Sequence, residues 1–594
     1  MAQSKAGRSI REANGPARSE PVQVRVQPVP MFRPRDRWWL AAVVVAAVLP
    51  YLDSLQGAFV FDDFGLVTQN PYAAPGMPLL AWFTRPSTSG SLYRPLTMVS
   101  YGLNALLSPN PLSYHLMNVA LHALAALAAF SLARSLLRST PAAGVAALLF
   151  AVHPVHTEPV ANIAGRAEVL AGLFSLLALA CFARATDAAA GKRLWFVASL
   201  AAFAAGLLSK ESAFATIALV ALVSMWIERA HLLTVVRRVL PYVALGVAFV
   251  ALRWFAVGAI TLAEPPPFID NPLAHVGLLA RLATALVVLG DYGSVLAVPL
   301  RLSADDSFNQ VPVVHSLADP RLVGTTAVIL ALALALGAAR RRMPVLPFAA
   351  LFFVFAIALT SNVCFPIGTI KAERMLYLPS FSWCLACGWL LRRWTGRVLG
   401  ERALVVALVL LGLAARTWVR NADWRDSYTL FTKTVATSPG SARAHANVAA
   451  VHGAAGDLDF ASDHFRAALE IYPEFGPALV GLAQVSALRG ARQDAIHWYS
   501  EAIRLEPANL EPYVRLGELL LQAGDARRAE EVYHAGLARV PNHPLLLLGV
   551  ASSLARQGDR SRANDFLARA EANPALPPDI ARRAQVLRRE LQGP

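Results

Sequence analysis

Long apolar runs alternate with short polar joints over the first 420 residues. The runs lie near 38–55, 114–133, 142–155, 167–183, 194–208, 212–228, 239–260, 322–339, 345–364, 376–391 and 403–420. As α-helices, these runs span or nearly span the roughly 30 Å hydrocarbon core of a bilayer, the shorter ones with help from tilt or neighbours. The pattern predicts an all-α protein whose first part is a polytopic membrane bundle of about 11 spans.

Basic joints recur after alternate runs and predict the orientation of this bundle. They contain Arg134/Arg138, Arg184/Lys192/Arg193, Arg229/Arg237/Arg238, residues 340–342 and Arg392/Arg393/Arg397/Arg402. The positive-inside rule places them in the cytoplasm together with residues 1–37, a basic tail that we expect to be disordered. A cleaved signal peptide is the alternative for the first run, but the many apolar segments that follow favour a retained anchor. Eleven crossings then leave the C-terminus outside.

Residues 275–300 fit this scheme poorly, because the topology requires an even number of crossings between the runs on either side. A re-entrant hairpin and an external helix are both open interpretations, and counts between 10 and 13 spans remain compatible with the pattern. The predicted membrane domain covers residues 38–420, with a first external loop at 56–113.

A different pattern, a 34-residue repeat, begins after residue 420. It appears in four registers: Pro439/Pro473/Pro507/Pro541, Gly456/Gly490/Gly524/Gly558, Ala461/Ala495/Ala529/Ala563 and the aromatic Phe465/Tyr499/Tyr533. This spacing predicts a tetratricopeptide repeat (TPR) domain at 421–594, with about four full repeats after a degenerate first half at 424–439. Such arrays form a concave surface that commonly holds extended peptide, and a purely bracing role is the alternative.

Composition supports a membrane protein and restricts the choice of partners. The chain is 56% hydrophobic and 16% charged, and its net charge of +15 is spread over loops, which favours an orientation signal over a nucleic-acid partner. Cys384 and Cys387 form a CxxC inside an apolar run, where packing is favoured over redox or zinc chemistry. Abundant Arg and Ala suggest a high-GC bacterium, hence an inner membrane and a periplasmic TPR domain.

Ionisable residues gather at the ends of the runs that this topology places outside. The candidates are Asp62, Asp63 and Arg94; His153, His156, Glu158, Arg166 and Glu168; Lys210 and Glu211; Asp305 and Asp306; and Lys371, Glu373, Arg374 and Tyr377. Charges at a membrane boundary are costly, so a group of them on one face predicts a functional site. Taken singly, each could instead be a salt bridge at the headgroup level.

Sequence motifs exclude several kinds of chemistry. The sequence HPVH is not HExxH, and Pro154 prevents a regular helix from presenting His153 and His156 together, so zinc hydrolysis has little support. The chain has no Walker loop, GxSxG elbow or dinucleotide fingerprint. An external site that lacks nucleotide sugars needs a lipid-carried donor. A polyprenyl phosphate sugar fits, with Arg and Lys on the phosphate and a carboxylate as the base for an acceptor hydroxyl.

Several stretches resemble one known family. FVFDD, YRPLTMVSYGLN, LLFAVHPVHTEPVANIAGRAEVLAGLF, LSKES and PIGTIKAERMLYLPS, followed by TPRs, are similar to the transmembrane and TPR-containing O-mannosyltransferases. This family resembles the GT-C glycosyltransferases, which are multi-span proteins with an acidic pair in the first external loop. The resemblance covers about residues 38–594. SKES departs from the more usual K-E-Q form, and Met375 replaces a more usual Leu or Tyr.

The resemblance implies a function and roles for individual residues. It implies transfer of mannose from a polyprenyl phosphate carrier to Ser or Thr hydroxyls of proteins, with the TPRs binding the acceptor. Asp62 and Asp63 match the acidic motif, and Asp63 is expected to be the base. Arg166, Lys210 and Arg374 are the candidates for the donor phosphate, assigned by their charge and their side of the membrane and not by the resemblance. A divalent cation is left open, because members of the superfamily differ in metal need. A membrane-anchored TPR scaffold and a lipid-linked sugar transporter or polymerase remain the alternatives.

Overall fold

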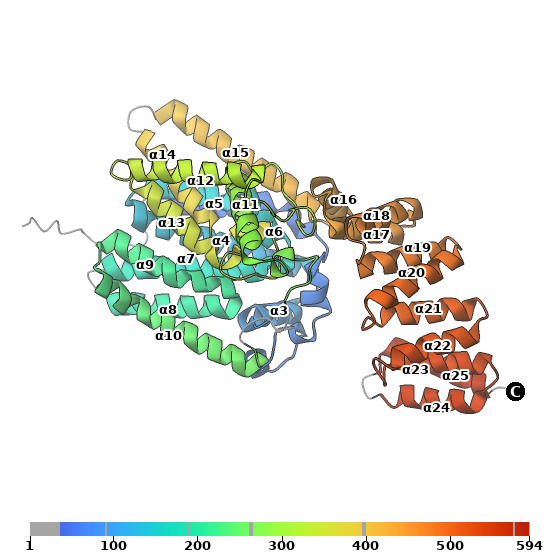
Figure 1. Cartoon of the computed structure of the whole chain (residues 1–594). Coiled ribbons are helices and arrows are strands. Elements are labelled where there is room, and N and C mark those ends of the chain that lie inside the picture. Colours follow the sequence, from blue (N-terminus) through green and yellow to red (C-terminus); the bar gives the residue numbers. More distant parts are fainter. Residues whose placement is uncertain are drawn as a thin grey trace, which may run out of the picture.

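The computed structural model describes residues 36–88, 92–187, 191–259, 265–394, 399–573 and 576–592, and these residues form helices and loops without strands. An N-terminal helical bundle is followed by a slender array of helix pairs that extends from one side of it (Figure 1). The prediction of an all-α bundle with a C-terminal solenoid is confirmed. The predicted basic tail lies outside the described residues, apart from Asp36 and Arg37.

Each of the eleven predicted spans contains a helix. These helices are α1 (Arg37–Val48), α4 (Pro111–Leu137), α5 (Thr140–Val152), α7 (Arg166–Asp187), α8 (Lys192–Ser209), α9 (Ala215–Glu228), α10 (Leu232–Val257), α12 (Pro320–Ala339), α13 (Val345–Ile357), α14 (Ser380–Trp394) and α15 (Leu399–Asp423). Eight of the described helices, one of them outside this set, are long and apolar enough to cross a membrane. The protein is a multi-pass membrane protein.

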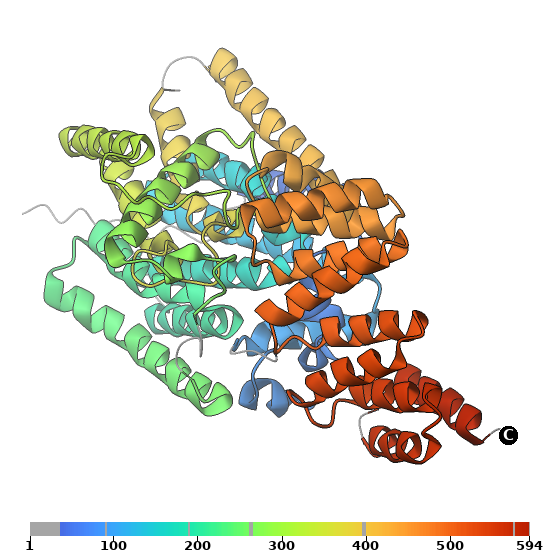
Figure 2. The same cartoon turned by 45° about the vertical axis from the view of Figure 1, so that its right-hand side comes forward.

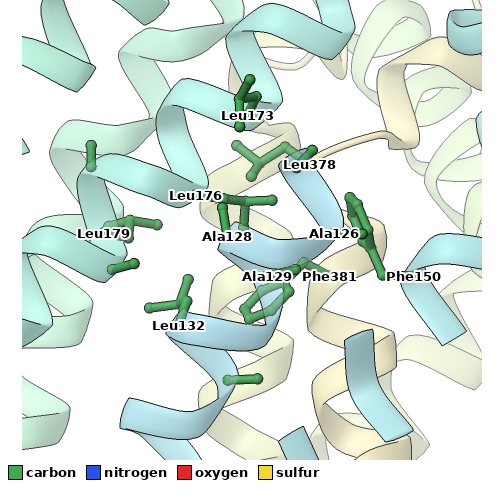
Figure 3. Close-up of a cluster of buried hydrophobic side chains, with 14 of the residues drawn as sticks. Ala126, Ala128, Ala129, Leu132, Phe150, Leu173, Leu176, Leu179, Leu378 and Phe381 are labelled. Carbon is green, nitrogen blue, oxygen red and sulfur yellow. The ribbon is translucent and has the colours of Figure 1, made fainter. Parts of the chain in front are cut away.

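Small residues let the central helices of the bundle approach closely. Ala126, Ala128 and Ala129 of α4 face Leu176 of α7 and Phe150 of α5 in a buried cluster (Figure 3). Bulk at these positions would separate the helices, since membrane helices associate largely through close packing and not through the hydrophobic effect. The peripheral helices differ: only 6% of the most apolar window of α12 is buried, so its aliphatic side chains are left to contact lipid.

The segment that fitted the topology poorly forms helix α11 (Leu278–Ala297). Phe308 N–H donates to Ile269 O at 3.0 Å, so the chain returns after α11 to the place that it left before it, and Leu296 O near the end of the helix bonds to His153. Figure 1 shows α11 crossing the direction of α12. Its residues Leu278, Leu279 and Leu282 are exposed, and α11 is the helix outside the predicted set that is long and apolar enough to cross a membrane.

The C-terminal array contains helix pairs in the predicted register. These are α17 (Ala442–Ala454) with α18 (Leu458–Ile471), α19 (Gly476–Leu488) with α20 (Arg492–Leu505), α21 (Glu511–Gln522) with α22 (Ala526–Leu537) and α23 (Pro544–Arg556) with α24 (Arg560–Glu571); α16 (Ser427–Thr437) precedes them and α25 (Pro578–Gln592) follows. The repeated glycines Gly456, Gly490, Gly524 and Gly558 have φ between +76° and +89°, a conformation that favours Gly over L-residues, and they turn the chain between paired helices.

Two contacts fix the base of the array to the bundle. Residues 303–310 of the loop after α11 dock on the residues that precede α17: Asn309 N–H donates to Gly440 O at 2.8 Å, and Ala442 N–H donates to Phe308 O at 2.9 Å. Near the other side, Ala58 N–H donates to Arg425 O at 2.9 Å, which joins the first loop to the end of α15. The array therefore stands on the face that carries the first loop, and Figure 2 shows it coming forward on that side.

Candidate functional site

The acidic pair lies in the loop between α1 and α4, just after a tight turn at Phe61, whose φ is 51°. Asp63 is fully buried. Its Oδ2 accepts a hydrogen bond from Val60 N–H at 2.9 Å, and its Oδ1 accepts one from Ala164 N–H at 2.7 Å. Burial raises the pKa of Asp63 to about 7, although these two N–H groups lower it. Asp63 thus ties the first loop to the turn before α7.

Asp62 points elsewhere although it is the adjacent residue. Its side chain is half-buried and lines a groove of about 1220 Å³. One wall of this groove belongs to the first loop, with Phe61 and Leu66, and the facing wall belongs to the inner helices α17 and α19 of the array. Of the two carboxylates, Asp62 is therefore the one that a molecule in the groove can reach.

Three cations and three carboxylates from different loops lie at the same end of the bundle as Asp62. We call Arg94, Glu158, Glu168, Lys210, Glu211 and Arg374 the charge cluster. Arg374 pairs with the buried carboxylate of Glu158 through its guanidinium, and its backbone N–H donates to the same side chain at 2.8 Å. Lys210 Nζ lies 3.0 Å from Glu168 Oε2. The first loop and three bundle joints, far apart in sequence, thus converge here.

The third carboxylate of the charge cluster bridges two cations. Arg94, at the start of α3 (Pro95–Leu107), donates through Nε and NH2 to Glu211 Oε2 at 3.2 Å, and Arg253 of α10 donates to Glu211 Oε1 at 3.0 Å. Arg253 was not predicted. Its signal was present in the sequence, because an ionisable residue within an apolar run is itself a site candidate.

Electrostatic interactions join these pairs into one site. The charge of Lys210 interacts with Arg94 and Arg374 as well as with Glu168. Burial lowers the pKa of the Arg374 guanidinium, but Glu158 and Asp62 outweigh it and raise this pKa above its ordinary value. Arg94, Lys210 and Arg374 are only partly exposed, with 18%, 12% and 23% of each side chain accessible. Such desolvated cations suit an anionic group better than fully hydrated surface charges.

Arg166 occupies a different place from the one that its prediction implied. Its side chain is fully buried, donating to Asn118 Oδ1 at 2.7 Å, to Asn104 Oδ1 at 2.6 Å and to Tyr114 O at 3.0 Å. The guanidinium also lies over the Tyr101 ring at 4.7 Å. With its donors directed to these groups, Arg166 clamps α3 and α4 together, and the geometry does not present it to a phosphate.

The predicted histidines and Tyr377 lie in the core between the helices. His153 bonds to Leu296 O at 3.1 Å, and His156 bonds to Phe150 O and Ser380 Oγ, each at 2.8 Å. The Tyr377 hydroxyl bonds to His122 at 2.9 Å. All are buried, so the HPVH sequence secures the end of α5 against α14. Over the described residues, three or more His, Cys, Asp or Glu side chains do not gather as metal ligands would.

Lys371 and Glu373 connect the last joint to the base of the array. Lys371 Nζ lies 3.4 Å from Asp306 Oδ2 and 3.6 Å from Asp291 of α11. Glu373 accepts a hydrogen bond from Ser303 N–H and lies 3.8 Å from Arg420 of α15. Burial raises the pKa of Glu373 to about 8, although Arg420 lowers it. These residues hold in place the segment that carries Arg374.

Asp305 and Asp306 contact the array directly. Asp305 Oδ2 accepts hydrogen bonds from Ser307 Oγ at 2.7 Å and Ser441 Oγ at 2.5 Å, and Asp306 Oδ1 accepts one from Ser438 Oγ at 3.2 Å. Sequence analysis could place this pair outside but gave no indication of its serine partners more than 130 residues away. These hydrogen bonds join the loop after α11 to the start of the array.

Comparison with known proteins points to one class. A family model described as Tetratricopeptide repeat matches residues 486–547. Curated relatives include a protein O-mannosyl-transferase of Caenorhabditis elegans (28% identical, covering 73% of this chain and 63% of the relative). Others are protein O-mannosyl-transferase TMTC3 of Mus musculus (29%, 85% and 60%) and TMTC1 of Homo sapiens (29%, 75% and 56%). The chain is thus similar to these transferases over most of its length and spans about 60% of theirs.

The solved structures that match cover about a quarter to a third of this chain. Chains titled MamA protein (17% identical, TM-score 0.23, covering 25% of this chain and 85% of that chain) and YrrB, a TPR protein (18%, 0.23, 32% and 92%), are among them. A TM-score at this level carries no argument about the present chain. The named relatives come from animals, so they give no support to a bacterial source.

Proposed function

We propose that this protein is a membrane glycosyltransferase that moves a mannosyl group from a polyprenyl phosphate carrier to Ser or Thr hydroxyls of proteins. One arrangement supports the proposal: Asp62 lies on the wall of the groove beneath the array, at the same end of the bundle as the ion pairs of the charge cluster. A base, a cationic site and a peptide-sized groove therefore meet at one place. The names of the relatives, protein O-mannosyl-transferases, support the sugar and the acceptor.

The charge cluster suits the donor phosphate. The hydrogen bonds of Arg94 to Glu211 leave its other terminal nitrogen to a ligand, and Lys210 has three N–H groups for a single carboxylate contact. A polyprenyl chain keeps its phosphate at the headgroup level, and the position of Lys210 between two apolar helices, α8 and α9, supports its contact with that phosphate. When the bond between the sugar C1 and the phosphate oxygen breaks, the phosphate gains negative charge. Preorganised cations stabilise that charge most in the transition state.

Asp62 acts as the base in this proposal. An acceptor hydroxyl in the groove attacks C1 of the mannosyl group, its proton passes to the Asp62 carboxylate, and polyprenyl phosphate leaves against Lys210 and Arg374. Attack opposite the leaving group inverts the anomeric centre. Asp63 has both oxygens bonded to backbone N–H groups and no exposure, which argues against the predicted role as base. We assign it the role of fixing the loop that presents Asp62.

The proposal also covers fold type and location. The multi-span bundle with an acidic pair in its first external loop supports assignment to the GT-C type. The Arg-bearing ends of α4 and α14 meet at the far end of the bundle, where Arg392 donates to Leu137 O, and the positive-inside rule makes that end cytoplasmic. The face with Asp62 and the array would then be extracytoplasmic. An Arg- and Ala-rich composition is the support for a bacterial inner membrane.

Reconstitution tests the proposed function. The full-length protein in vesicles, supplied with mannosyl polyprenyl phosphate and a Ser/Thr peptide, should yield a peptide heavier by one hexose in mass spectrometry. The donor should be consumed in equal amount. Peptide binding without donor consumption would favour the scaffold. Movement of the lipid-linked sugar across the vesicle membrane without peptide modification would favour a transporter.

A further inference from the structure

The groove beneath the array has a wall of aromatic rings. Phe268, from the loop before α11, stacks on Tyr472 with ring centroids 5.8 Å apart and an interplanar angle of 27°. Phe308 lies 4.8 Å from Phe268 and supports it from behind. Phe268 and Tyr472 are half-buried and line the groove together with Phe475. The bundle and the array thus build this wall jointly.

Carboxylates accompany the aromatic wall. Glu474, Glu506 and Glu511 line the same groove, with Asp62 and Asp270 nearer the first loop. Among the described lining residues Arg443 is the one basic side chain, and it is paired with Asp270. The groove is therefore acidic although the chain as a whole carries a net charge of +15. The acidic character of the groove is therefore a local property, opposite in sign to the net charge of the chain.

The carboxylates lie close enough to the aromatic wall to affect it electrostatically. Burial raises the pKa of the Tyr472 phenol, and the charges of Glu474 and Glu506 raise it further, so the field of both carboxylates reaches this ring. The carboxylate of Glu506 is packed against Gly476, where an added Cβ would lie 2.3 Å from Oε1. Gly476 thus leaves room for Glu506 beside the Tyr472 wall.

We propose that the groove binds an extended acceptor segment that carries a Lys or Arg side chain, with its cation held between the Phe268–Tyr472 wall and the carboxylates of Glu474 and Glu506. A cation over an aromatic face gains from the ring quadrupole, and neighbouring carboxylates add charge complementarity. This inference deepens the proposed function and rests on it for the identity of the acceptor. The cation site itself rests on the groove alone.

The architecture sets the spacing between the cation and the acceptor hydroxyl. Asp62 faces α17, whereas Glu474, just before α19, and Glu506, just after α20, lie one to two helix spacings further along the array. Packed helices lie about 10 Å apart, so this offset is about 10–20 Å. An extended peptide advances about 3.3 Å per residue. The Lys or Arg should therefore lie about three to six residues from the Ser or Thr, on one side of it.

Peptide binding to the full-length protein in detergent, without sugar donor, tests this inference. Fluorescent peptides of about twelve residues would carry one Ser and a single Lys at varied distance, with Gln at the same position as the reference. We expect the best Lys peptide to bind about tenfold more tightly than its Gln counterpart, and added salt should reduce the difference because it screens the charges. Equal binding of Lys and Gln peptides at every spacing would overturn the inference.

Variants locate the effect. In the double variant Glu474→Gln/Glu506→Gln, the preference for Lys should fall to within about twofold. The control Glu501→Gln removes a carboxylate of α20 that pairs with Arg504 outside the groove, and it should keep the full preference. A preference that survives the double variant would overturn the assignment to this wall. Melting curves confirm that each variant is folded.

This design separates the inference from the proposed function. Charge-selective binding with no hexose transfer to the bound peptide would contradict the glycosyltransferase and leave the cation site standing. Hexose transfer with no charge preference would contradict the cation site and leave the glycosyltransferase standing.

Discussion

Glu158 holds Arg374 at two points, accepting the Arg374 backbone N–H at 2.8 Å and its guanidinium through the second carboxylate oxygen. Glu158 is itself 1% exposed, so it presents a fixed acceptor rather than a mobile one. The pair spans 216 residues and joins the short helix α6 (Thr157–Ala161) to the joint before α14. Arg374 is thereby oriented while part of its guanidinium stays accessible.

Replacing Glu158 by Gln should impair use of the lipid donor. The amide keeps one acceptor but loses the charge that orients Arg374, and a hydrogen bond between charged groups contributes about 1.5–3 kcal/mol. We expect kcat/KM for the lipid donor to fall about 10- to 100-fold, mostly through kcat, while the affinity for acceptor peptide is unchanged. Steady-state kinetics with varied donor provides the measurement. Glu228→Gln, in an ion pair with Arg238 elsewhere in the bundle, is the control.

Arg166 should prove to be a stability residue. Arg166→Met leaves the buried oxygens of Asn104 and Asn118 without their donor, which should lower the stability of the protein by about 3 kcal/mol or more. The folded fraction should keep its donor affinity, because Arg166 lies away from the charge cluster. Thermal unfolding in detergent and donor binding together test this. A stable variant with weakened donor binding would restore the phosphate role.

Glu373 should make stability depend on pH. Its folded pKa, about 8, lies above the unfolded value of about 4.3, so its contribution is fully present below pH 4 and is lost as pH rises through 8. Glu373→Gln is neutral at every pH. The melting temperature of this variant minus that of wild type should therefore rise by several degrees between pH 5 and pH 8. A difference that stays constant over this range would contradict the raised pKa.

Much of the fold could be predicted from local pattern. The 34-residue registers of Gly456 and Ala461 depend on nearest-neighbour packing, which a short sequence period records directly. The spans follow from length and hydropathy. Helix α11 is ambiguous in sequence because an interfacial helix and a span have similar length and composition.

The sequence predicted which residues belong to the site better than it predicted what each of them does. Charge and side placed Arg166 and Arg374 in the same class, yet Arg166 is enclosed by Asn104 and Asn118 and Arg374 is not. Sequence could not separate them, because the difference depends on which helices pack beside each guanidinium. Likewise, the sequence could not show which of the adjacent residues Asp62 and Asp63 is buried and which is accessible. The turn at Phe61 sends one carboxylate into the groove and the other toward Ala164.

The aromatic and acidic wall of the groove had no signal in sequence. Phe268 lies in a loop between apolar runs and Tyr472 lies at the end of a repeat helix, about 200 residues further along the chain. Taken alone, each of these two aromatic residues is what ordinary hydrophobic packing would require. Their stacking depends on how the array is docked on the bundle by the loop after α11.

The central claim is that Asp62 takes the proton of the acceptor hydroxyl, and hexose transfer by Asp62→Asn and Asp63→Asn in reconstituted vesicles tests it most directly. Asp62→Asn should lose transfer by about 10²–10⁴-fold, the range of general base catalysis, while keeping donor binding, peptide binding and the wild-type melting temperature. Asp63→Asn should lose activity together with stability, because it disturbs the bonds to Val60 and Ala164. Near wild-type transfer by Asp62→Asn would contradict the account.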